Sequence, residues 1–348
     1  MSSSISSSEP WRRFFRLTVG AAAVVAGVVY AFVVLVDPFD SLPLSPPLNR
    51  VPVASNQRFA FPTLARSQRF DSAVFGTSSS RLLRPEVMNP LFAARFANLA
   101  MNDATVYEQS RLFGVFARAH AEAKLVMVGL DYRWCVTGPD FERLTFRTFP
   151  EWMYQDNPWR GYGEMFNSYA IQSAGQLFGI LIGVKTPDQG RDGFTSFVPP
   201  DHTYDPARAL GHLRASHPAV PVGDRNGPSA DWIYPAMPVL RDMLAALPVA
   251  TRKILFFIPY HHRMLTPPGS PGAMVWDECR RRVVMAAAGA ANTVVVDFMR
   301  LSPITSADDH YWDGIHYRIG IADRLARDMA AAARGERSED YEVLWPGR

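Results

Sequence analysis

The chain has 348 residues, of which 48% are hydrophobic and 20% are charged, and these values indicate a folded protein with one large domain or two small ones. The net charge of +3 and the lack of a run of Lys or Arg give no electrostatic case for nucleic-acid binding, and no nucleic-acid partner is expected. Two cysteines, Cys135 and Cys279, are too few for a disulfide framework or a cysteine zinc site. They either pair in an oxidising compartment or remain two separate buried thiols.

The first element that the sequence predicts is a membrane-spanning helix over residues 17–36. Three arginines lie within residues 1–16, and twenty uncharged residues follow, from Leu17 to Val36. At helical rise twenty residues cover about 30 Å, the thickness of the bilayer hydrocarbon. The positive-inside rule then predicts that residues 1–16 are a cytoplasmic tail of a single-pass protein of the cytoplasmic (inner) membrane. The main domain would be periplasmic or extracellular.

A cleaved signal peptide is the alternative interpretation of this segment. Its apolar core would be unusually long, and the Asp-Pro-Phe-Asp sequence that follows lacks the small residues of a cleavage site. We therefore expect an uncleaved anchor.

Proline dominates the next segment, with six prolines in residues 37–65. This density predicts an extended, semi-rigid spacer that holds a domain away from the bilayer. A packed domain is expected over residues 66–335, and residues 336–348 are expected to be a C-terminal tail.

Within that domain, strand and helix patterns alternate. Strands are expected at residues 72–75, 96–101, 125–130, 254–258 and 293–298, and helices at 105–123, 237–247, 273–290 and 318–333. Thr105 and Glu108 predict a capping box for the first of these helices. This alternation predicts an α/β fold with a doubly wound parallel sheet, in which a site lies at the C-terminal ends of the strands.

Residues 136–228 interrupt the alternation and are expected to be an insertion, a helical cap followed by an irregular loop rich in Pro and Gly. The insertion contains several Trp, Tyr and Phe residues. These aromatic side chains either pack on the edge of the domain or form a lid or a platform for a glycan.

The candidate active site combines two segments from opposite ends of the domain. Gly76, Thr77 and Ser78 follow the first strand directly, as expected of a turn that presents a nucleophile, although Ser79 and Ser80 are alternatives in another register. Asp313 and His316 lie just before the last helix. A serine nucleophile needs a histidine base, and that base needs a carboxylate to orient it.

Taken together, Gly76-Thr77-Ser78 after the first strand and Asp313-x-x-His316 before the last helix resemble the SGNH/GDSL hydrolase superfamily. The order serine, aspartate, histidine matches, and the resemblance covers about residues 70–333. It implies an SGNH-like three-layer sandwich. More narrowly, the chain looks like membrane-tethered members that act on envelope polymers, such as the D-alanyl-lipoteichoic acid transfer proteins. It departs from the family in having Thr77 where many members have Asp, and in lacking a Gly-x-Asn-Asp block.

Further residues are expected to assist the chemistry. The backbone N–H of Ser78 is a natural oxyanion donor, and the resemblance points to Asn102 as a second one. Arg81 and Arg133 are candidates for binding an anionic group of the substrate. His310 lies beside Asp308 and Asp309, but this spacing matches no recognised metal-ligand pattern, and we expect neither a metal nor an organic cofactor.

The sequence therefore predicts an extracytoplasmic serine acyl-esterase or acyltransferase that acts through an acyl-Ser78 intermediate. The expected substrate is an acylated envelope polysaccharide or a similar ester, by analogy with the family. Hydrolysis and acyl transfer share every residue up to the acyl-enzyme, and both stay open. The alternative is a non-catalytic accessory protein with the same fold that binds an envelope glycan or a membrane acyltransferase.

Overall fold

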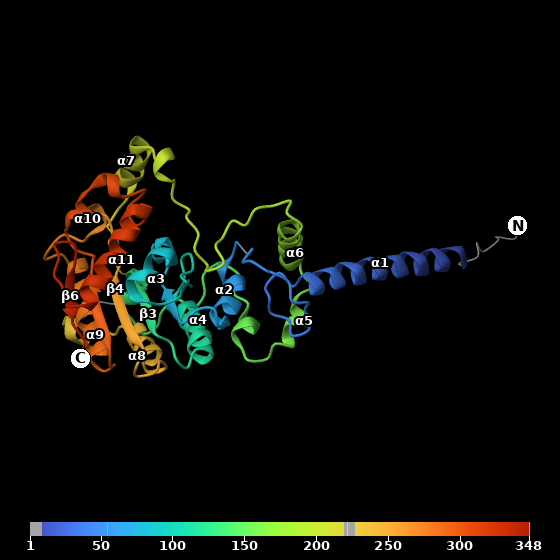
Figure 1. The fold of residues 1–348 in the computed structure, drawn as a ribbon, viewed down its shortest axis with the longest axis horizontal. Helices are drawn as coiled ribbons and strands as arrows, with labels where there is room; N and C mark the ends of the chain where they lie inside the picture. Colours follow the sequence, from blue (N-terminus) through green and yellow to red (C-terminus); the bar gives the residue numbers. More distant parts are fainter. Residues whose placement is uncertain (1–8, 54, 219–220, 222–226, 348) are drawn as a thin grey trace, which may run out of the picture. The chain divides into compact units, whose positions relative to one another are not determined.

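A computed structural model describes residues 9–53, 55–218, 221 and 227–347 (Figure 1). The chain divides into two compact units, which we call the helical unit (residues 1–54 and 155–187) and the sheet unit (residues 55–154 and 188–348). The expected insertion at 136–228 is thus shared between them. Residues 1–8 of the expected cytoplasmic tail, and 219–220 and 222–226 of the expected insertion, lie outside the described residues.

The helical unit is built on α1 (Glu9–Val36), which is long and apolar enough to cross a membrane. The helix begins before the expected span, so that residues 9–16 of the predicted tail are helical. It ends where Asp37 adopts a left-handed conformation (φ 44°) ahead of Pro38. Arg50 Nε donates to the last carbonyl, that of Val36, at 2.8 Å. The unit also contains α5 (Arg160–Glu164) and α6 (Ser168–Leu181).

The sheet unit contains a six-stranded sheet with the order β2-β1-β3-β4-β5-β6. The strands are β1 (Ser72–Phe75), β2 (Phe96–Asn98), β3 (Leu125–Leu130), β4 (Arg252–Phe257), β5 (Thr293–Asp297) and β6 (Glu342–Trp345). All neighbours pair in parallel except β5 and β6, which are antiparallel. Every residue of β1 and β3 is buried, as in parallel strands covered on both faces. The expected α/β class is confirmed.

Helices precede and connect these strands in the sheet unit. They are α2 (Gln57–Arg66), α3 (Pro85–Phe92), α4 (Val106–Ala119), α7 (Pro206–Ala215), α8 (Ala236–Ala245), α9 (Pro271–Ala288), α10 (Pro303–Ser306) and α11 (Ile319–Ala333). Short 3-10 turns lie at Ser80–Leu82, Tyr132–Cys135, Glu151–Tyr154, Asp201–Thr203, Ser229–Asp231, His262–Met264 and Asp308–His310. The expected capping box is present, since Thr105 and Glu108 each bind the backbone N–H of the other.

Two segments differ from the sequence-based expectation. Residues 57–65 were expected to belong to an extended spacer, but they lie in α2, because the buried Arg58 on that helix pairs with the buried Glu108 of α4. The expected C-terminal tail contains β6, which pairs with β5 at the edge of the sheet. The ion pair of Asp340 with Arg324 of α11 holds the chain on its way to that edge.

The two cysteines form a disulfide. Cys135 follows β3, Cys279 lies on α9, and their Cα atoms are 5.4 Å apart. This settles the choice that the sequence left open. The bond joins residues separated by 144 positions and ties α9 to the end of a central strand.

We predict that the double substitution C135A/C279A lowers the free energy of unfolding by about 2–4 kcal/mol, because the unfolded chain regains the freedom that the cross-link removes. Urea unfolding of the full chain in detergent, followed by tryptophan fluorescence, measures the loss. Reductant should move the wild-type midpoint to that of the variant and leave the variant unchanged. A wild-type midpoint that stays fixed after both thiols have been alkylated would contradict the prediction.

Candidate functional site

Ser78 lies in a sharp turn directly after β1. The turn begins at Gly76, whose φ of +147° is seldom adopted by residues with a side chain, and a Cβ there would collide with the side chain of Ser80. The carbonyl of Gly76 accepts a hydrogen bond from Met101 N at 3.0 Å, which brings the loop after β2 beside the turn. Ser78 itself is only half-buried. The hydroxyl of Ser78 therefore lies in the turn at the C-terminal end of β1.

The structure brings Ser78, His316 and Asp313 into one hydrogen-bonded chain. Ser78 Oγ lies 2.8 Å from His316 Nε2, and His316 Nδ1 lies 2.7 Å from Asp313 Oδ2. A carboxylate only accepts, and so Nδ1 carries the proton and Nε2 is left to accept the hydrogen of Ser78. This is the tautomer in which a histidine acts as a base toward serine.

Asp313 is held as an anion. Burial would raise the pKa of this carboxyl, but the hydrogen bond and charge of His316, together with the backbone N–H groups of Ile315 and His316, outweigh it and lower the pKa. Asp313 therefore remains ionised at neutral pH and can stabilise an imidazolium on His316.

Two further hydrogen bonds join the turn after β1 to the loop before α11. Ser79 Oγ donates to the carbonyl of Ile315 at 2.8 Å, and the buried Tyr317 donates through its hydroxyl to the carbonyl of Ser79 at 2.6 Å. Ser79 and Tyr317 are each one residue away from a member of the Ser78–His316 pair. Both sides of that pair are therefore fixed by the backbone. Ser79, an alternative nucleophile in the sequence analysis, has this positioning role.

Asn98, at the end of β2, binds the backbone that follows Ser78. The sequence analysis did not identify this residue as part of the site. Its buried amide nitrogen lies 2.8–3.2 Å from the carbonyl oxygens of Ser80, Arg81 and Leu83, and its oxygen accepts from the backbone of Ala100. An amide has both donors and an acceptor, which is what this cluster of backbone groups requires. The only signal in the sequence was a polar residue in a short apolar strand.

Of the two residues expected to supply oxyanion donors, Ser78 lies in the turn after β1 and Asn102 contacts Arg81, three residues further along. The backbone N–H of Ser78 has no acceptor in the part of the chain that the structure describes. Asn102 Oδ1 accepts from Arg81 Nη1 at 2.7 Å, and because a guanidinium can only donate, the NH₂ group of Asn102 is turned away from Arg81. Gln57 and Arg58 of α2 hold the backbone of Asn102. One helix thus positions this candidate donor.

The two arginines expected to bind substrate differ in their surroundings. Arg133 is committed to Asp103 and Glu142, and although burial opposes the charge, these hydrogen bonds raise its pKa. Arg81 is buried, forms no ion pair among the described residues, and its Nε has no hydrogen-bond partner. Burial lowers the pKa of Arg81 to about 10. Arg81 therefore remains a candidate for binding an anion, and Arg133 does not.

Phe197, from the expected insertion, lies between Arg81 and His316 and contacts both. Its ring meets that of His316 edge to face at 5.1 Å between centroids, and the Arg81 guanidinium lies 5.7 Å from the same ring. Phe197 is 40% exposed. No local pattern in the sequence distinguishes this aromatic residue from its neighbours in the insertion.

Thr77 has a partner that explains its place in the turn. Its hydroxyl donates to Asp131 Oδ2 at 2.8 Å, and Asp131 Oδ1 accepts from the backbone of Arg133. Burial raises the pKa of Asp131 to about 6, against the effect of these two hydrogen bonds. A buried carboxyl at the end of β3 thus supports the residue next to Ser78.

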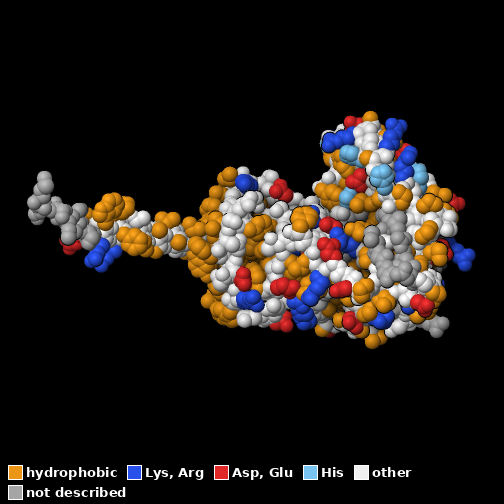
Figure 2. Space-filling model, turned by 180° about the vertical axis from the view of Figure 1, so that it is seen from behind, with side chains coloured by type: hydrophobic (Ala, Val, Ile, Leu, Met, Phe, Trp, Pro, Cys, Tyr) orange, Lys and Arg blue, Asp and Glu red, His pale blue; other side chains and the backbone are white. Residues whose placement is uncertain are grey.

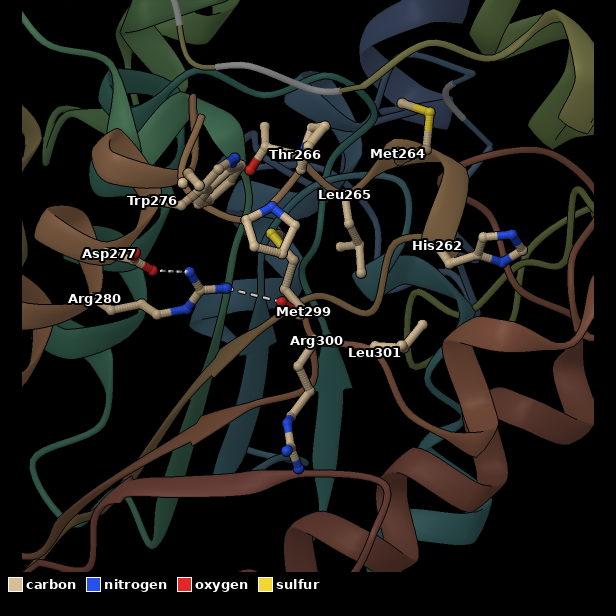
Figure 3. A pocket seen from close by; sticks show the side chains of 14 residues that line it. His262, Met264, Leu265, Thr266, Trp276, Asp277, Arg280, Met299, Arg300 and Leu301 are labelled. Atoms are coloured by element: carbon tan, nitrogen blue, oxygen red, sulfur yellow. Dashed lines mark hydrogen bonds and ion pairs between the residues drawn. The ribbon is translucent and has the colours of Figure 1, made fainter. Parts of the chain in front are cut away.

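A pocket of about 480 Å³ lies near the C-terminal ends of β4 and β5 (Figure 3). Ser78, Asp313 and His316 are not among its lining residues. Met264 belongs to the lining and also packs against Gly314, where a Cβ would lie 2.6 Å from its sulfur. The Arg280 guanidinium in this pocket donates hydrogen bonds to Asp297, Asp277 and the carbonyl of Met299. The pocket therefore borders the loop that carries Asp313 and His316 but does not contain them.

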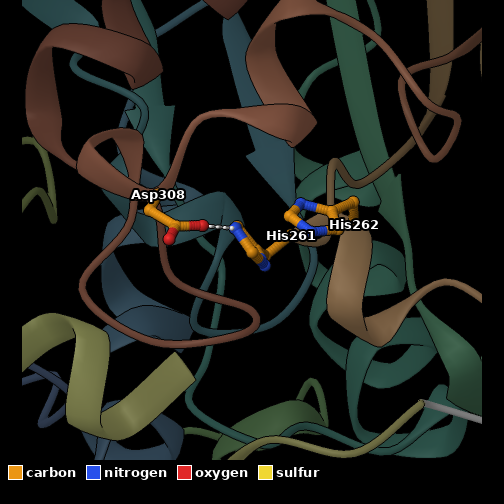
Figure 4. A group of neighbouring side chains, drawn as sticks. All are labelled: His261, His262 and Asp308. Atoms are coloured by element: carbon orange, nitrogen blue, oxygen red, sulfur yellow. Dashed lines mark hydrogen bonds and ion pairs between the residues drawn. The ribbon is translucent and has the colours of Figure 1, made fainter. Parts of the chain in front are cut away.

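In the described part of the chain, His261, His262 and Asp308 are the group that could hold a metal ion (Figure 4). His261 Nδ1 accepts from the backbone of Arg263 at 3.3 Å, so Nε2 carries the proton and donates to Asp308 at 3.0 Å. His262 Nδ1 meets the carbonyl of Thr305. Burial, then the neighbouring His262, lower the pKa of His261 despite Asp308. These hydrogen bonds satisfy the ligand atoms of His261, and we interpret the cluster as structural.

No protein-family model matches this chain, and no curated protein matches it in sequence. The geometry of the site is thus the basis for assigning a function.

We predict that Asp131→Asn changes how stability depends on pH. The folded carboxyl keeps its proton up to about pH 6, whereas the unfolded one, with an ordinary pKa of 3.8, releases it earlier. The wild type should therefore lose stability, relative to the variant, as pH rises from about 4 to about 6, by on the order of 2–3 kcal/mol. Denaturation of both proteins across this range measures the difference.

Thr77→Val provides a second variant, because it removes a hydrogen bond that lowers the pKa of Asp131. The pKa of Asp131 should therefore be higher in Thr77→Val, and the pH range over which this variant loses stability should extend to higher pH than in the wild type. A difference between wild type and Asp131→Asn that is the same at every pH would refute the assignment.

Proposed function

We propose that this protein is a serine ester hydrolase or O-acyltransferase of the SGNH/GDSL type, with Ser78 as its nucleophile. The observation that carries the proposal is the chain Ser78–His316–Asp313, with its two hydrogen bonds of 2.8 and 2.7 Å. A serine, a histidine in the tautomer of a base and an ionised carboxylate are the parts that acyl transfer through serine requires.

The reaction proceeds in two halves. Ser78 Oγ attacks the ester carbonyl carbon while His316 Nε2 takes its proton, and the negative oxygen that forms faces the N–H of Ser78 and the NH₂ of Asn102. The C–O bond to the alcohol then breaks, and His316 gives its proton to the departing oxygen. Water or an acceptor hydroxyl attacks acyl-Ser78 with His316 again as base, and the proton finally returns to Ser78.

The fold supports the same interpretation. From β1 the chain moves to β2 on one side and then to β3, β4 and β5 on the other, so the strand order reverses at β1. With right-handed crossovers, this reversal places α3 on one face of the sheet and α4, α8 and α9 on the other. The packing of α3 with α11 and of α4 with α8 fits that arrangement. We propose that the sheet is doubly wound, as in an SGNH-like sandwich, with Ser78 at the switch point.

We further propose that α1 anchors the protein in the cytoplasmic (inner) membrane and that the sheet unit lies in the periplasm or outside the cell. The arginines near the start of α1 favour a cytoplasmic N-terminus. The disulfide favours an oxidising compartment for the sheet unit. An enzyme tethered in this way suits an acylated envelope glycan as its substrate.

Arg81 supplies a restriction on that substrate. A buried guanidinium without a carboxylate partner is costly, and the binding of an anionic group would offset the cost. We propose that the substrate carries a carboxylate or phosphate near its ester.

An accessory protein that binds a glycan or a membrane acyltransferase is the second candidate. The pocket of about 480 Å³ favours this candidate, because a ligand could bind there without contacting Ser78, Asp313 or His316, which do not line the pocket. It predicts a folded protein whose serine has no special reactivity.

A fluorophosphonate probe tests the first proposal on the full chain in detergent. We predict that the wild type is labelled and that Ser78→Ala abolishes labelling. Asp313→Asn should slow labelling by about a hundredfold or more, because it removes the anion that fixes the tautomer of His316.

Ser80→Ala is the matched control for the labelling experiment. The Ser80 hydroxyl is buried without a hydrogen-bond partner, so its removal should leave labelling intact. Absence of labelling in a folded wild type would favour the accessory protein. Equal labelling of wild type and Ser78→Ala would exclude Ser78 as the nucleophile.

The role of Arg81 can be tested with two nitrophenyl esters, the neutral acetate and the anionic hemisuccinate. We predict that Arg81→Gln lowers kcat/KM for the anionic ester about 10- to 100-fold more than for the neutral one, as expected for a lost charge-assisted hydrogen bond. Asn102→Ala should lower both alike, because an oxyanion donor acts on either ester. An unchanged preference in Arg81→Gln would remove the restriction to anionic substrates.

A further inference from the structure

The helical unit contains a second segment without charges. Residues 165–184 include no Asp, Glu, Lys or Arg over twenty positions. Their central part is α6 (Ser168–Leu181), which at 14 residues is too short to cross a bilayer. The segment begins just after the Arg160–Glu164 pair and is followed by Lys185.

This uncharged segment packs against the C-terminal part of α1. The rings of Tyr30 and Phe166 meet edge to face at 6.0 Å between centroids, and those of Phe32 and Phe178 at 5.6 Å. The Tyr30 hydroxyl donates to the carbonyl of Tyr162 at 2.9 Å. In Figure 1, α6 lies beside the end of α1 that is farther from the N-terminus.

The position of these contacts along α1 determines how deep they would lie in a bilayer that α1 spans. Charged groups begin at Asp37, immediately after α1, and Arg50 pairs with Asp40 beside the last carbonyl of the helix. At 1.5 Å per residue, Phe32 lies about 6 Å and Tyr30 about 9 Å from Val36 toward the centre of the apolar helix. Elements that lie in the membrane interface reach about 5–10 Å into it.

The exposed side of α6 carries large apolar side chains beside the uncharged polar residues Ser168 and Gln172. Ala170, Ser173, Ala174 and Leu177 are buried, whereas Ile171, Phe178 and Ile182 are 36–57% exposed and form another stripe along the helix axis. A helix on the surface of a soluble domain shows polar residues on its outer face. Hydrophobic side chains gather where α1 joins the rest of its unit (Figure 2).

We propose that residues 165–184 form a second membrane-embedded element, which lies in the outer interfacial layer of the bilayer around the end of α1. The inference rests on the proposed membrane anchoring by α1. The occupant of the exposed stripe is lipid, because the stripe continues the apolar surface of α1 and carries no charge that would recognise a polar partner. Trp159, which is 58% exposed and stacks on Tyr162, and Lys185 then fall at the headgroup level, where such side chains are favoured.

Spin labels on the full chain in phosphatidylcholine vesicles test this inference. Single cysteines replace Phe178 and Ile182 on α6, Val25 in the middle of α1, and Val249, an exposed apolar residue of the sheet unit. The accessibility of each label to dissolved oxygen, which concentrates in lipid, is compared with its accessibility to a water-soluble nickel chelate. We expect the labels at 178 and 182 to lose nickel accessibility and retain oxygen accessibility, as at 25 and in contrast to 249.

The label at 25 separates failure of the anchor from failure of the inference. Nickel access at 25 would show that α1 does not span the bilayer, and the inference would fall with it. Lipid exposure at 25 together with nickel access at 178 and 182 would overturn the inference alone. Exclusion of both reagents at 178 and 182 would also overturn it, since the stripe would then be covered by protein.

Discussion

The turn that carries Ser78 and the loop that carries His316 come from opposite ends of the sheet unit, and their neighbours join them. Ser79 and Ile315 lie 236 positions apart, yet a hydrogen bond connects them, and Tyr317 adds a second one. A nucleophile and its base must be held within a fraction of an ångström to react. Here the backbones on both sides of the pair are fixed, which leaves the side chains only local rotations.

A second layer of buried polar groups supports these two loops. Asn98 binds the carbonyls that follow Ser80, Asp131 receives the hydroxyl of Thr77, and α2 holds Asn102 through Gln57 and Arg58. Each buried group would be costly without its partner. Some buried atoms of this region remain without a partner, among them Ser80 Oγ, Arg81 Nε and Arg133 Nε. Arg81 differs from Arg133 in forming no ion pair among the described residues, so on the proposed function a negative substrate group would gain most beside Arg81.

Local patterns in the sequence predicted the elements that local forces decide. The short strand before Gly76, the capping box of Thr105 and the spacing of Asp313 and His316 all lie where expected. The elements that were missed depend on partners far along the chain. Helix α2 needs Glu108, β6 needs the free edge of β5, and the roles of Asn98 and Phe197 follow only from which loops meet in space. No pattern within a window of residues contains that information.

The distance between Ser78 and His316 along the chain also has a consequence for biogenesis. The ribosome makes Ser78 early and His316 238 residues later, after more than nine tenths of the chain has been synthesised. Until the segment before α11 has emerged and docked, Ser78 lacks its hydrogen bond to His316 and, through it, the link to Asp313. On the proposed function, a nascent or truncated chain would therefore lack reactivity toward esters, because the hydrogen-bonded chain of Ser78, His316 and Asp313 would be incomplete.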